Sequence, residues 1–145
     1  MLVRHRMTPN PQTVGPEETL AVAFEKMASG QFRRLPVVDE DLLVGILTDR
    51  DLRRYEGRFK EVRVAEAMTE KPLTLSPDET VERAAEVMIR NKISGLPVAL
   101  GTRLVGILTT TDVMRAFLEV MTLTRKGGST SCGAGSATRP GPSTR

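Results

Sequence analysis

The chain is poor in aromatic residues, which make up 3% of its 145 residues, and tryptophan is absent. Proteins that bind single-stranded nucleic acid stack successive bases on aromatic side chains. The composition therefore argues against a nucleic-acid binder of that kind.

Cysteine and histidine are equally scarce, with one of each, Cys132 and His5. Disulfide frameworks, zinc sites and Cys–His nucleophile pairs all need more of these residues than the chain has. Acidic pairs are no better placed for catalysis: Asp49 and Asp51 straddle a predicted turn and could at most hold Mg²⁺. We therefore predict that the protein is not an enzyme and that it has no catalytic cofactor or metal.

Long apolar runs are also missing. No stretch approaches the 18 apolar residues that a membrane-spanning helix needs. Arg4, His5 and Arg6 interrupt the apolar character that a secretory signal would show near the start. The sequence predicts a soluble, cytoplasmic protein without a membrane partner.

Charge is nearly balanced, at a formal net value of +3. Three of the cations, Lys126, Arg139 and Arg145, lie in the last 20 residues, where there is no acid. Without them the remaining 125 residues hold 18 basic and 18 acidic side chains. That body has no bulk attraction for nucleic acid or anionic membranes, so any anion site must come from local clustering.

The main positive feature is an internal duplication with an offset of 61 residues. Residues 43–51 read LVGILTDRD and residues 104–112 read LVGILTTTD. Residues 7–54 and 68–115 align without a gap, with about 21 identities in 48 pairs. A duplication of this kind predicts two copies of one small unit that share a core, because a unit of about 60 residues buries little by itself.

Each copy predicts the order strand, helix, strand, strand, helix. Ser76, Pro77 and Glu79 are typical of a helix start, with a capping serine and a proline at the first helical position; Pro16 is the counterpart in the first copy. Apolar residues at positions i, i+3, i+4 and i+7 predict one buried helix face per copy. These residues are Leu20, Ala23, Phe24 and Met27, and Val81, Ala84, Ala85 and Met88.

Short apolar segments predict a hairpin after each helix, and an extended piece precedes each helix. The hairpin strands are expected at 35–38 with 43–47, and at 96–100 with 104–108; the extended pieces are 12–14 and 73–75. A second helix is expected near Asp51 and Asp112, and the sequence VAEAM in the link predicts a short helical turn. The last helix carries an apolar stripe around Phe117 that we expect to pack on the first copy or on a partner chain.

The predicted division is residues 1–61 for the first copy, 62–125 for the second, and 126–145 for a tail. The tail is rich in Gly, Ser, Thr and Pro. Such a composition cannot bury a core and predicts disorder, so we assign it no function.

Threonine and aspartate recur where the third strand of each copy turns into a helix, as Thr48 with Asp51 and Thr109 with Asp112. A helix N-terminus favours an anion such as phosphate. An aspartate beside it can accept two hydrogen bonds from a ribose diol, each worth about 1.5–3 kcal/mol. Phosphate and diol together indicate a nucleotide. The alternative is that each pair is only an N-terminal cap, which a duplication would preserve equally well.

The chain resembles a tandem pair of cystathionine-β-synthase (CBS) domains, the Bateman module. The resemblance rests on Met7-Thr8, the helix stripes, the segment RRLPVV at 33–38, LVGILTDRD, and their partners 61 residues on. It covers about residues 1–122, and the first copy is similar to acetoin-utilisation-type bacterial CBS proteins. It implies an α/β (α+β) fold in which two β-α-β-β-α units pack sheet to sheet about a pseudo-twofold axis.

The resemblance also implies two clefts that bind adenosine-containing ligands. It places Thr48 and Asp51 in one cleft and Thr109 and Asp112 in the other, with aspartate on the ribose and threonine near phosphate. Backbone of the first strands and of the segments before Leu-Pro-Val would frame the adenine. These framing residues are Thr13, Val14, Thr74, Leu75, Phe32, Ile93 and Ser94.

The two copies differ in local charge. The first carries a cluster of arginines, whereas the second has Ser94-Gly95 and Thr110-Thr111 at corresponding positions. In CBS proteins such arginines commonly meet phosphates, so we expect the cleft near them to prefer the more charged ligand. The alternative is a solvated surface run that pairs with Asp39, Glu40 or Asp41. The clustered arginines are Arg33, Arg34, Arg50, Arg53 and Arg54.

Together these features predict a regulatory module that binds AMP, ADP, ATP or S-adenosylmethionine and signals occupancy to an attached domain or to a partner protein. The resemblance also implies a homodimer formed through helices. The alternative is an interaction module of the same fold whose clefts are empty and which acts only through dimerisation.

Overall fold

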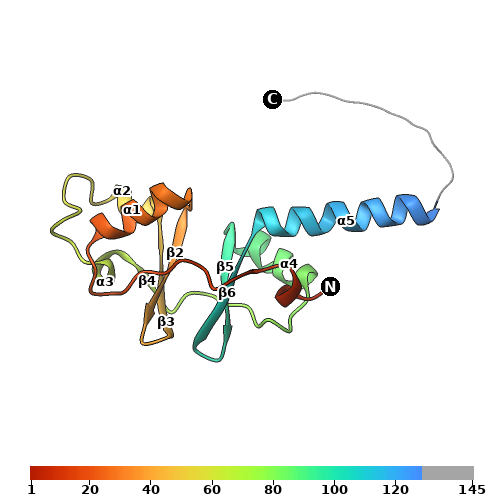
Figure 1. Ribbon diagram of the computed structural model, residues 1–145, viewed down its shortest axis with the longest axis horizontal. Coiled ribbons are helices and arrows are strands. Elements are labelled where there is room, and N and C mark those ends of the chain that lie inside the picture. The colour runs from red at the N-terminus through yellow and green to blue at the C-terminus, as the bar shows by residue number, and fades with distance from the viewer. Residues whose placement is uncertain (129–145) are drawn as a thin grey trace, which may run out of the picture. The chain divides into compact units, whose positions relative to one another are not determined.

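The computed structural model describes residues 1–128. By its internal contacts the chain forms two compact units, Met1–Val113 and Met114–Arg145. The first contains every described strand, and the described part of the second is the remainder of the last helix (Figure 1). The elements in chain order are η1 (Val3–His5), β1 (Thr8–Pro9), α1 (Leu20–Gly30), β2 (Arg34–Asp39), β3 (Leu42–Thr48), α2 (Asp49–Arg53), α3 (Val64–Ala67), β4 (Thr69–Glu70), α4 (Val81–Asn91), β5 (Gly95–Leu100), β6 (Arg103–Thr109) and α5 (Thr110–Gly128).

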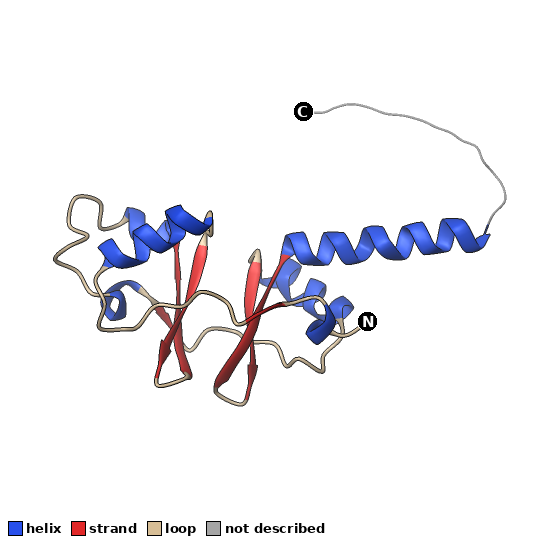
Figure 2. Cartoon of the chain, viewed as in Figure 1, coloured by secondary structure: helices blue, strands red, loops and turns tan. Residues whose placement is uncertain are grey.

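The two predicted hairpins are present. Strands β2 and β3 pair antiparallel, as do β5 and β6, and both hairpins carry a register shift at the same place, after Val37 and after Val98. In the first hairpin Glu40 and Asp41 have φ of 50° and 69°, the backbone that a tight two-residue turn needs. Figure 2 shows the hairpins side by side, with α1, α2 and α3 beyond the first and α4 beyond the second.

The segments that lead into the two copies are exchanged. Strand β1 of the first copy pairs with β6 of the second, and β4 of the second pairs with β3 of the first. Thr8 lies opposite Ile107, and Thr69 lies opposite Ile46; these two pairs differ by a shift of 61 residues. Such reciprocal pairing is what a pseudo-twofold relation between the copies produces.

The exchange explains the glycine in the repeated sequence LVGIL. A Cβ atom on Gly106 would lie 2.6 Å from Met7 Sδ, and one on Gly45 would lie 2.6 Å from Met68 Sδ. The methionine that precedes each exchanged strand thus occupies the space that a side chain would need. A glycine is required in both hairpins for the partner copy's segment to approach.

Each hydrophobic core also takes residues from the other copy. Val62 and Val64 belong to the core around Leu20, Leu35 and Leu47. In the second core the contributed residue is Val3, which is fully buried. Backbone bonds hold the contributed segments: Leu20 N–H donates to Val62 O at 2.9 Å, and Val81 N–H donates to Met1 O at 3.0 Å. A division of the chain after residue 61 therefore cuts both cores.

Two local predictions need correction. Helix α4 begins at Val81 after Thr80, whose Oγ1 accepts from Arg83 N–H, and not at Ser76. Ser76 instead closes a separate turn, in which its N–H donates to Glu79 Oε2 at 2.7 Å. The pieces at 12–14 and 73–75 are not regular strands; each forms one parallel bridge, Val14 with Val37 and Leu75 with Val98. The turn that follows, with Pro16 or Pro77, leads the chain away before a second pair can form.

Two further differences concern helices. Phe24 was expected in the buried stripe of α1 but is 49% exposed, with its ring 5.4 Å from that of Phe59. Helix α5 runs to Gly128, so residues 126–128, assigned to the tail, are helical; Lys126 is a good helix former and continues the helix. Residues 129–145 lie outside the described part.

Candidate functional site

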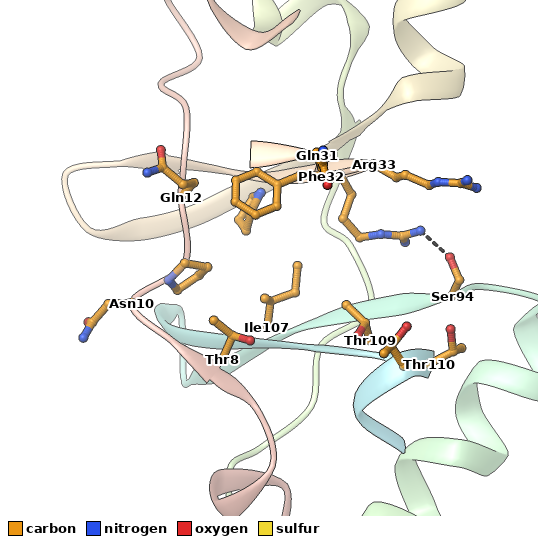
Figure 3. Close-up of a pocket in the computed structure, with 14 residues that line it drawn as sticks. Thr8, Asn10, Gln12, Gln31, Phe32, Arg33, Ser94, Ile107, Thr109 and Thr110 are labelled. Atoms are coloured by element: carbon orange, nitrogen blue, oxygen red, sulfur yellow. Dashed lines mark hydrogen bonds between the residues drawn. The ribbon is translucent and has the colours of Figure 1, made fainter. Parts of the chain in front are cut away.

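One cavity of about 630 Å³ lies in the first unit, between segments of both copies (Figure 3). The first copy contributes the lead-in segment that carries β1 and the turn between α1 and β2. The second copy contributes Ser94, the end of β6 and the first residues of α5. The lining residues are Thr8, Asn10, Pro11, Gln12, Gln31, Phe32, Arg33, Arg34, Pro36, Ser94, Ile107, Thr109, Thr110 and Thr111.

The upper wall of the cavity in Figure 3 is made by Gln31, Phe32 and Arg33, and local backbone geometry sets their position. Helix α1 ends at Gln31, which has the left-handed φ of 58° and donates its N–H to Met27 O. This turn reverses the chain, so that Phe32, Arg33 and Arg34 enter β2 along the cavity. Phe32 is 41% exposed and offers its ring to the cavity rim.

The lower wall in Figure 3 carries Thr8, Ile107, Thr109 and Thr110. Thr8 and Ile107 are there because β1 pairs with β6. At the start of α5, Thr110 N–H donates to Ser94 O at 2.9 Å, which ties the helix to the segment before β5. The exchange of lead-in segments is therefore what brings the two copies together around this space.

The charge of the lining has one sign. Arg33 and Arg34 are its ionisable residues, and no Asp or Glu is among the fourteen. Eight others have neutral polar side chains: Thr8, Asn10, Gln12, Gln31, Ser94, Thr109, Thr110 and Thr111. An anionic group with several hydrogen-bonding atoms suits such a lining.

Arg34 joins the two copies. Its Nη2 donates to Ser94 Oγ and its Nη1 donates to Gly95 O at 3.5 Å. Burial lowers the pKa of Arg34 most; Asp49 raises that pKa in part and Arg33 lowers it further. Even so, an arginine keeps its charge at neutral pH, because its ordinary pKa lies far above neutral.

The arginine cluster does not pair with the acidic turn at 39–41. Within residues 1–128, the ion pair that the cluster makes joins Arg53 to Asp49, at 3.8 Å. Arg33 is exposed, and its carbonyl accepts from Asp49 N–H at 2.9 Å. Arg33 is among the residues that line the cavity, and within residues 1–128 it makes no ion pair with Asp39, Glu40 or Asp41.

The threonine–aspartate pairs form helix caps. Asp51 Oδ2 accepts from Thr48 N–H at 2.9 Å, and Thr48 Oγ1 accepts from Asp51 N–H at 3.2 Å. In the second copy Asp112 Oδ2 accepts from Thr109 N–H at 2.9 Å and from Thr109 Oγ1 at 3.0 Å. The capping alternative therefore describes these side chains as they stand in the structure, and neither aspartate lines the cavity.

The cavity brings together five of the fourteen residues that the sequence singled out: Phe32, Arg33, Arg34, Ser94 and Thr109. Thr48, Arg50 and Asp51 lie at the start of α2, the duplicate of the cavity's helix start. Val14 and Leu75 are buried, where they bridge to the hairpins. The remaining residues outside the lining are Thr13, Thr74, Ile93 and Asp112. Which of the fourteen contact a ligand stays a prediction.

Sequence reasoning missed nine lining residues. Thr8, Pro11, Pro36 and Ile107 carried a signal, since each is identical in both copies. Thr110 and Thr111 were noted only as the counterparts of Asp49 and Arg50. Asn10, Gln12 and Gln31 had no signal, because they differ from their counterparts and reach the cavity only through the exchange.

Within residues 1–128, no helix is both long enough and apolar enough to cross a membrane. The same residues contain no group of three His, Cys, Asp or Glu side chains that could hold a metal ion.

Comparison with known proteins gives consistent results. The family model of the CBS domain matches twice, over residues 3–58 and 64–119. A CBS domain-containing protein of Dictyostelium discoideum is 33% identical over 136 residues, covering 83% of this chain and 94% of that protein. Inosine-5'-monophosphate dehydrogenase of Methanocaldococcus jannaschii is 37% identical over 105 residues, covering 71% of this chain. The chain spans only 21% of that enzyme's length.

Solved structures show the same fold. CBSX2, a CBS-pair protein of Arabidopsis thaliana, has been solved in complex with AMP; that structure has a TM-score of 0.77 and 30% identity, over 83% of this chain and 98% of that one. The acetoin utilization protein AcuB from Vibrio cholerae has a TM-score of 0.78 and 28% identity, over 87% of this chain and 96% of that one. With both copies matched by the family model and the paired arrangement shared with these structures, the chain belongs to the CBS domain family as a tandem CBS pair.

Proposed function

We propose that this tandem CBS pair is a regulatory module that binds an adenine nucleotide in the cavity between its copies. The observation that carries the proposal is the cavity lining: two arginines, eight neutral polar side chains and no carboxylate. A volume of about 630 Å³ falls within the range of about 300–1,000 Å³ that is common for small-molecule sites. The complex of CBSX2 with AMP supports the choice of ligand class.

The parts of a nucleotide have distinct partners in this proposal. The phosphate lies near Arg33 and the first turn of α5, where a guanidinium and backbone N–H groups favour an anion. The half-exposed ring of Phe32 offers an aromatic face to the base. The ribose lies toward Thr109 and Asp112, because the cap engages Asp112 Oδ2 and leaves Oδ1 for a hydroxyl group.

The ligand acts by stabilising one arrangement of the copies. A ligand that binds only the folded pair stabilises it by about 2.7 kcal/mol at a hundredfold excess over Kd. Because the ligand binds one arrangement of the copies more tightly than the other, it raises the population of that arrangement. A partner that contacts only that arrangement then binds more tightly as well. The regulated element is a partner protein or an attached domain, and the module itself carries out no reaction.

A second candidate is an interaction module whose cavity is empty. The observation that favours it is that both Thr–Asp pairs form helix caps. Helix α5 also exposes large apolar side chains on which a second copy could pack: Met114, Phe117, Leu118, Met121 and Leu123.

Thermal unfolding with ligands separates the two candidates. Wild type is heated with AMP, ADP, ATP, S-adenosylmethionine and, as a base control, GMP, each at millimolar concentration. We expect an adenine nucleotide to raise Tm by several degrees and Arg33→Gln to lose most of that rise. Arg90→Gln, which removes an exposed arginine of α4 outside the cavity, is the matched control and should respond as wild type does.

If no ligand raises Tm of a folded sample, the nucleotide proposal fails and the interaction module remains. A rise that Arg33→Gln leaves intact would place the nucleotide elsewhere than in this cavity.

A further inference from the structure

Arg34 and Gly95 occupy the same position in the two copies, 61 residues apart, and they meet. The Arg34 guanidinium reaches Gly95 O and Ser94 Oγ of the other copy. A Cβ atom on Gly95 would lie 3.0 Å from both Cδ and Nε of Arg34. The space between positions 34 and 95 is therefore occupied by one long side chain, that of Arg34. Gly95, at the equivalent position of the other copy, is buried and has no side chain to compete for that space.

That single arginine is one difference between the two duplicated faces. The cavity has a counterpart defined by the duplication, which we call the duplicate face: Thr48, Asp49, Arg50, Lys71 and Lys92, the counterparts of Thr109, Thr110, Thr111, Asn10 and Gln31. The duplicate face also has cations, but Arg50, Lys71 and Lys92 are all exposed. Arg34 is half-buried, and a half-buried charge is screened less by solvent and salt.

Acidic groups add to the difference. Asp49 stands where the cavity has Thr110, at the same step from strand to helix. Asp49 lies close enough to Arg34 to raise the pKa of that arginine, so it offsets part of its positive charge. Asp49 is nevertheless not a lining residue, and the cavity lining contains no acid. The half-buried charge of Arg34 and the lack of a carboxylate in the lining both favour anion binding in the cavity over binding at the duplicate face.

We propose that the dipeptide Arg33-Arg34, present in one copy only because the space at Gly95 admits one arginine, decides which of the two faces binds the nucleotide first. The proposal rests on the proposed function and adds to it a direction: the cavity at Thr109–Thr111 fills before the duplicate face at Thr48–Arg50. The determinant is the side chain that crosses between the copies and not the Thr–Asp pair, which is the same in both.

The direct test is a titration of isotope-labelled full chain with AMP, followed by the amide resonances of both faces. We expect the resonances of Thr109, Thr110 and Thr111 to saturate at a concentration at least about tenfold lower than those of Thr48, Asp49 and Arg50. Arg34→Gln should bring the two concentrations within about threefold of each other. Simultaneous saturation in wild type, or the reverse order, overturns the proposal.

Exchanging the dipeptides provides the sharpest variant. In the fourfold variant Arg33→Ser, Arg34→Gly, Ser94→Arg and Gly95→Arg the composition is unchanged and the arginine crosses from the other copy. We expect the resonances at Thr48–Arg50 to saturate first. If the variant folds and the order stays as in wild type, the dipeptide is not the determinant; if it does not fold, the wild-type and Arg34→Gln titrations decide.

The chain supplies matched controls in Lys71→Asn and Lys92→Gln. Each installs the residue that the first copy has at the same left-handed backbone, since φ is 50° at Lys71 and 48° at Asn10, and 56° at Lys92 and 58° at Gln31. Both variants should leave the AMP affinity of the cavity within about twofold of wild type, because exposed lysines are strongly screened. A tenfold loss of AMP affinity in either variant would mean that the duplicate face is the site that binds AMP first.

Failure of this inference is distinguishable from failure of the proposed function. If AMP shifts both sets of resonances together, the chain is a nucleotide binder without the predicted order. If AMP shifts neither set, the function falls, and the inference falls with it.

Discussion

The two copies have the same residues at the centres of their cores and differ at the surfaces proposed to contact a ligand. Leu35, Val37 and Leu47 are buried in one copy, and Leu96, Val98 and Leu108 in the other, at identical positions. Around the cavity nine of the fourteen lining residues differ from their counterparts, including Arg33, Arg34, Thr110 and Thr111. This comparison indicates that the residues identical in both copies specify how each copy folds, whereas the residues that differ between the copies specify what each face can bind.

The helix starts illustrate the same division. In both copies threonine and aspartate form the cap, with Asp Oδ2 to Thr N–H distances of 2.9 Å. Between them, one copy has Asp49-Arg50 and the other Thr110-Thr111. The capping residues are kept because they satisfy backbone donors that every helix leaves unpaired. The residues between them belong to neither hydrophobic core and are free to differ.

The largest expected effect tests whether the two cores are equivalent. Leu47→Ala and Leu108→Ala each remove a fully buried side chain from the middle of a hairpin. Each should lower the free energy of unfolding by about 2–5 kcal/mol. Because the environments are duplicates, the two losses should agree within about 1 kcal/mol. Urea unfolding measures both; a larger gap would show that the copies do not carry equal shares of the stability.

An intermediate effect separates capping from binding. Thr48→Ala and Thr109→Ala each remove a cap and should cost about 0.5–2 kcal/mol of stability. Thr109 lines the cavity and Thr48 does not. We expect AMP affinity, measured by calorimetry, to fall in Thr109→Ala and to stay near wild type in Thr48→Ala. An equal fall in both variants would mean that loss of a cap acts on binding through stability alone.

The smallest expected effect concerns pH. Burial lowers the pKa of Arg34, so the charged form is disfavoured in the folded state. That cost is constant at any pH where Arg34 is protonated in both states, and folding would gain stability only as pH rises toward the lowered pKa. Since arginine remains charged well above neutral pH, the difference in urea midpoint between wild type and Arg34→Gln should be constant from pH 6 to 9. A difference that changes across this range would mean that Arg34 loses its proton far below its usual pKa.

Much of the fold was predictable because the signals are local. The hairpins follow from short apolar segments and tight turns, and the Thr–Asp caps from a three-residue spacing. The predicted start of α4 was wrong for an equally local reason. Ser76 and Glu79 form the hydrogen bond of a capping turn, but the residue that caps the helix is the following Thr80. Two start signals in succession are not distinguished by spacing alone.

The candidate site was less predictable because its walls come from distant segments. Arg33 and Arg34 were identified by their charge, and they line the cavity. Asp51 and Asp112 were identified by their repetition, and they do not. Repetition marks what both copies need, which includes the helix cap, whereas the features of a single face are by definition not repeated. Contact of either aspartate with a ligand stays a prediction.

The amino-acid order alone establishes the duplication, the apolar faces, the turns and the unequal distribution of arginine, since each depends on residues within one short segment. The pairing of the lead-in segments was decided only by the tertiary structure. Met7-Thr8 and Met68-Thr69 are identical, and so are the LVGIL segments that receive them. In sequence terms Thr8 fits Ile46 of its own copy as well as Ile107 of the other. The folded chain pairs it with Ile107. Through that pairing, segments of both copies line the cavity, and Arg34 comes to face Gly95.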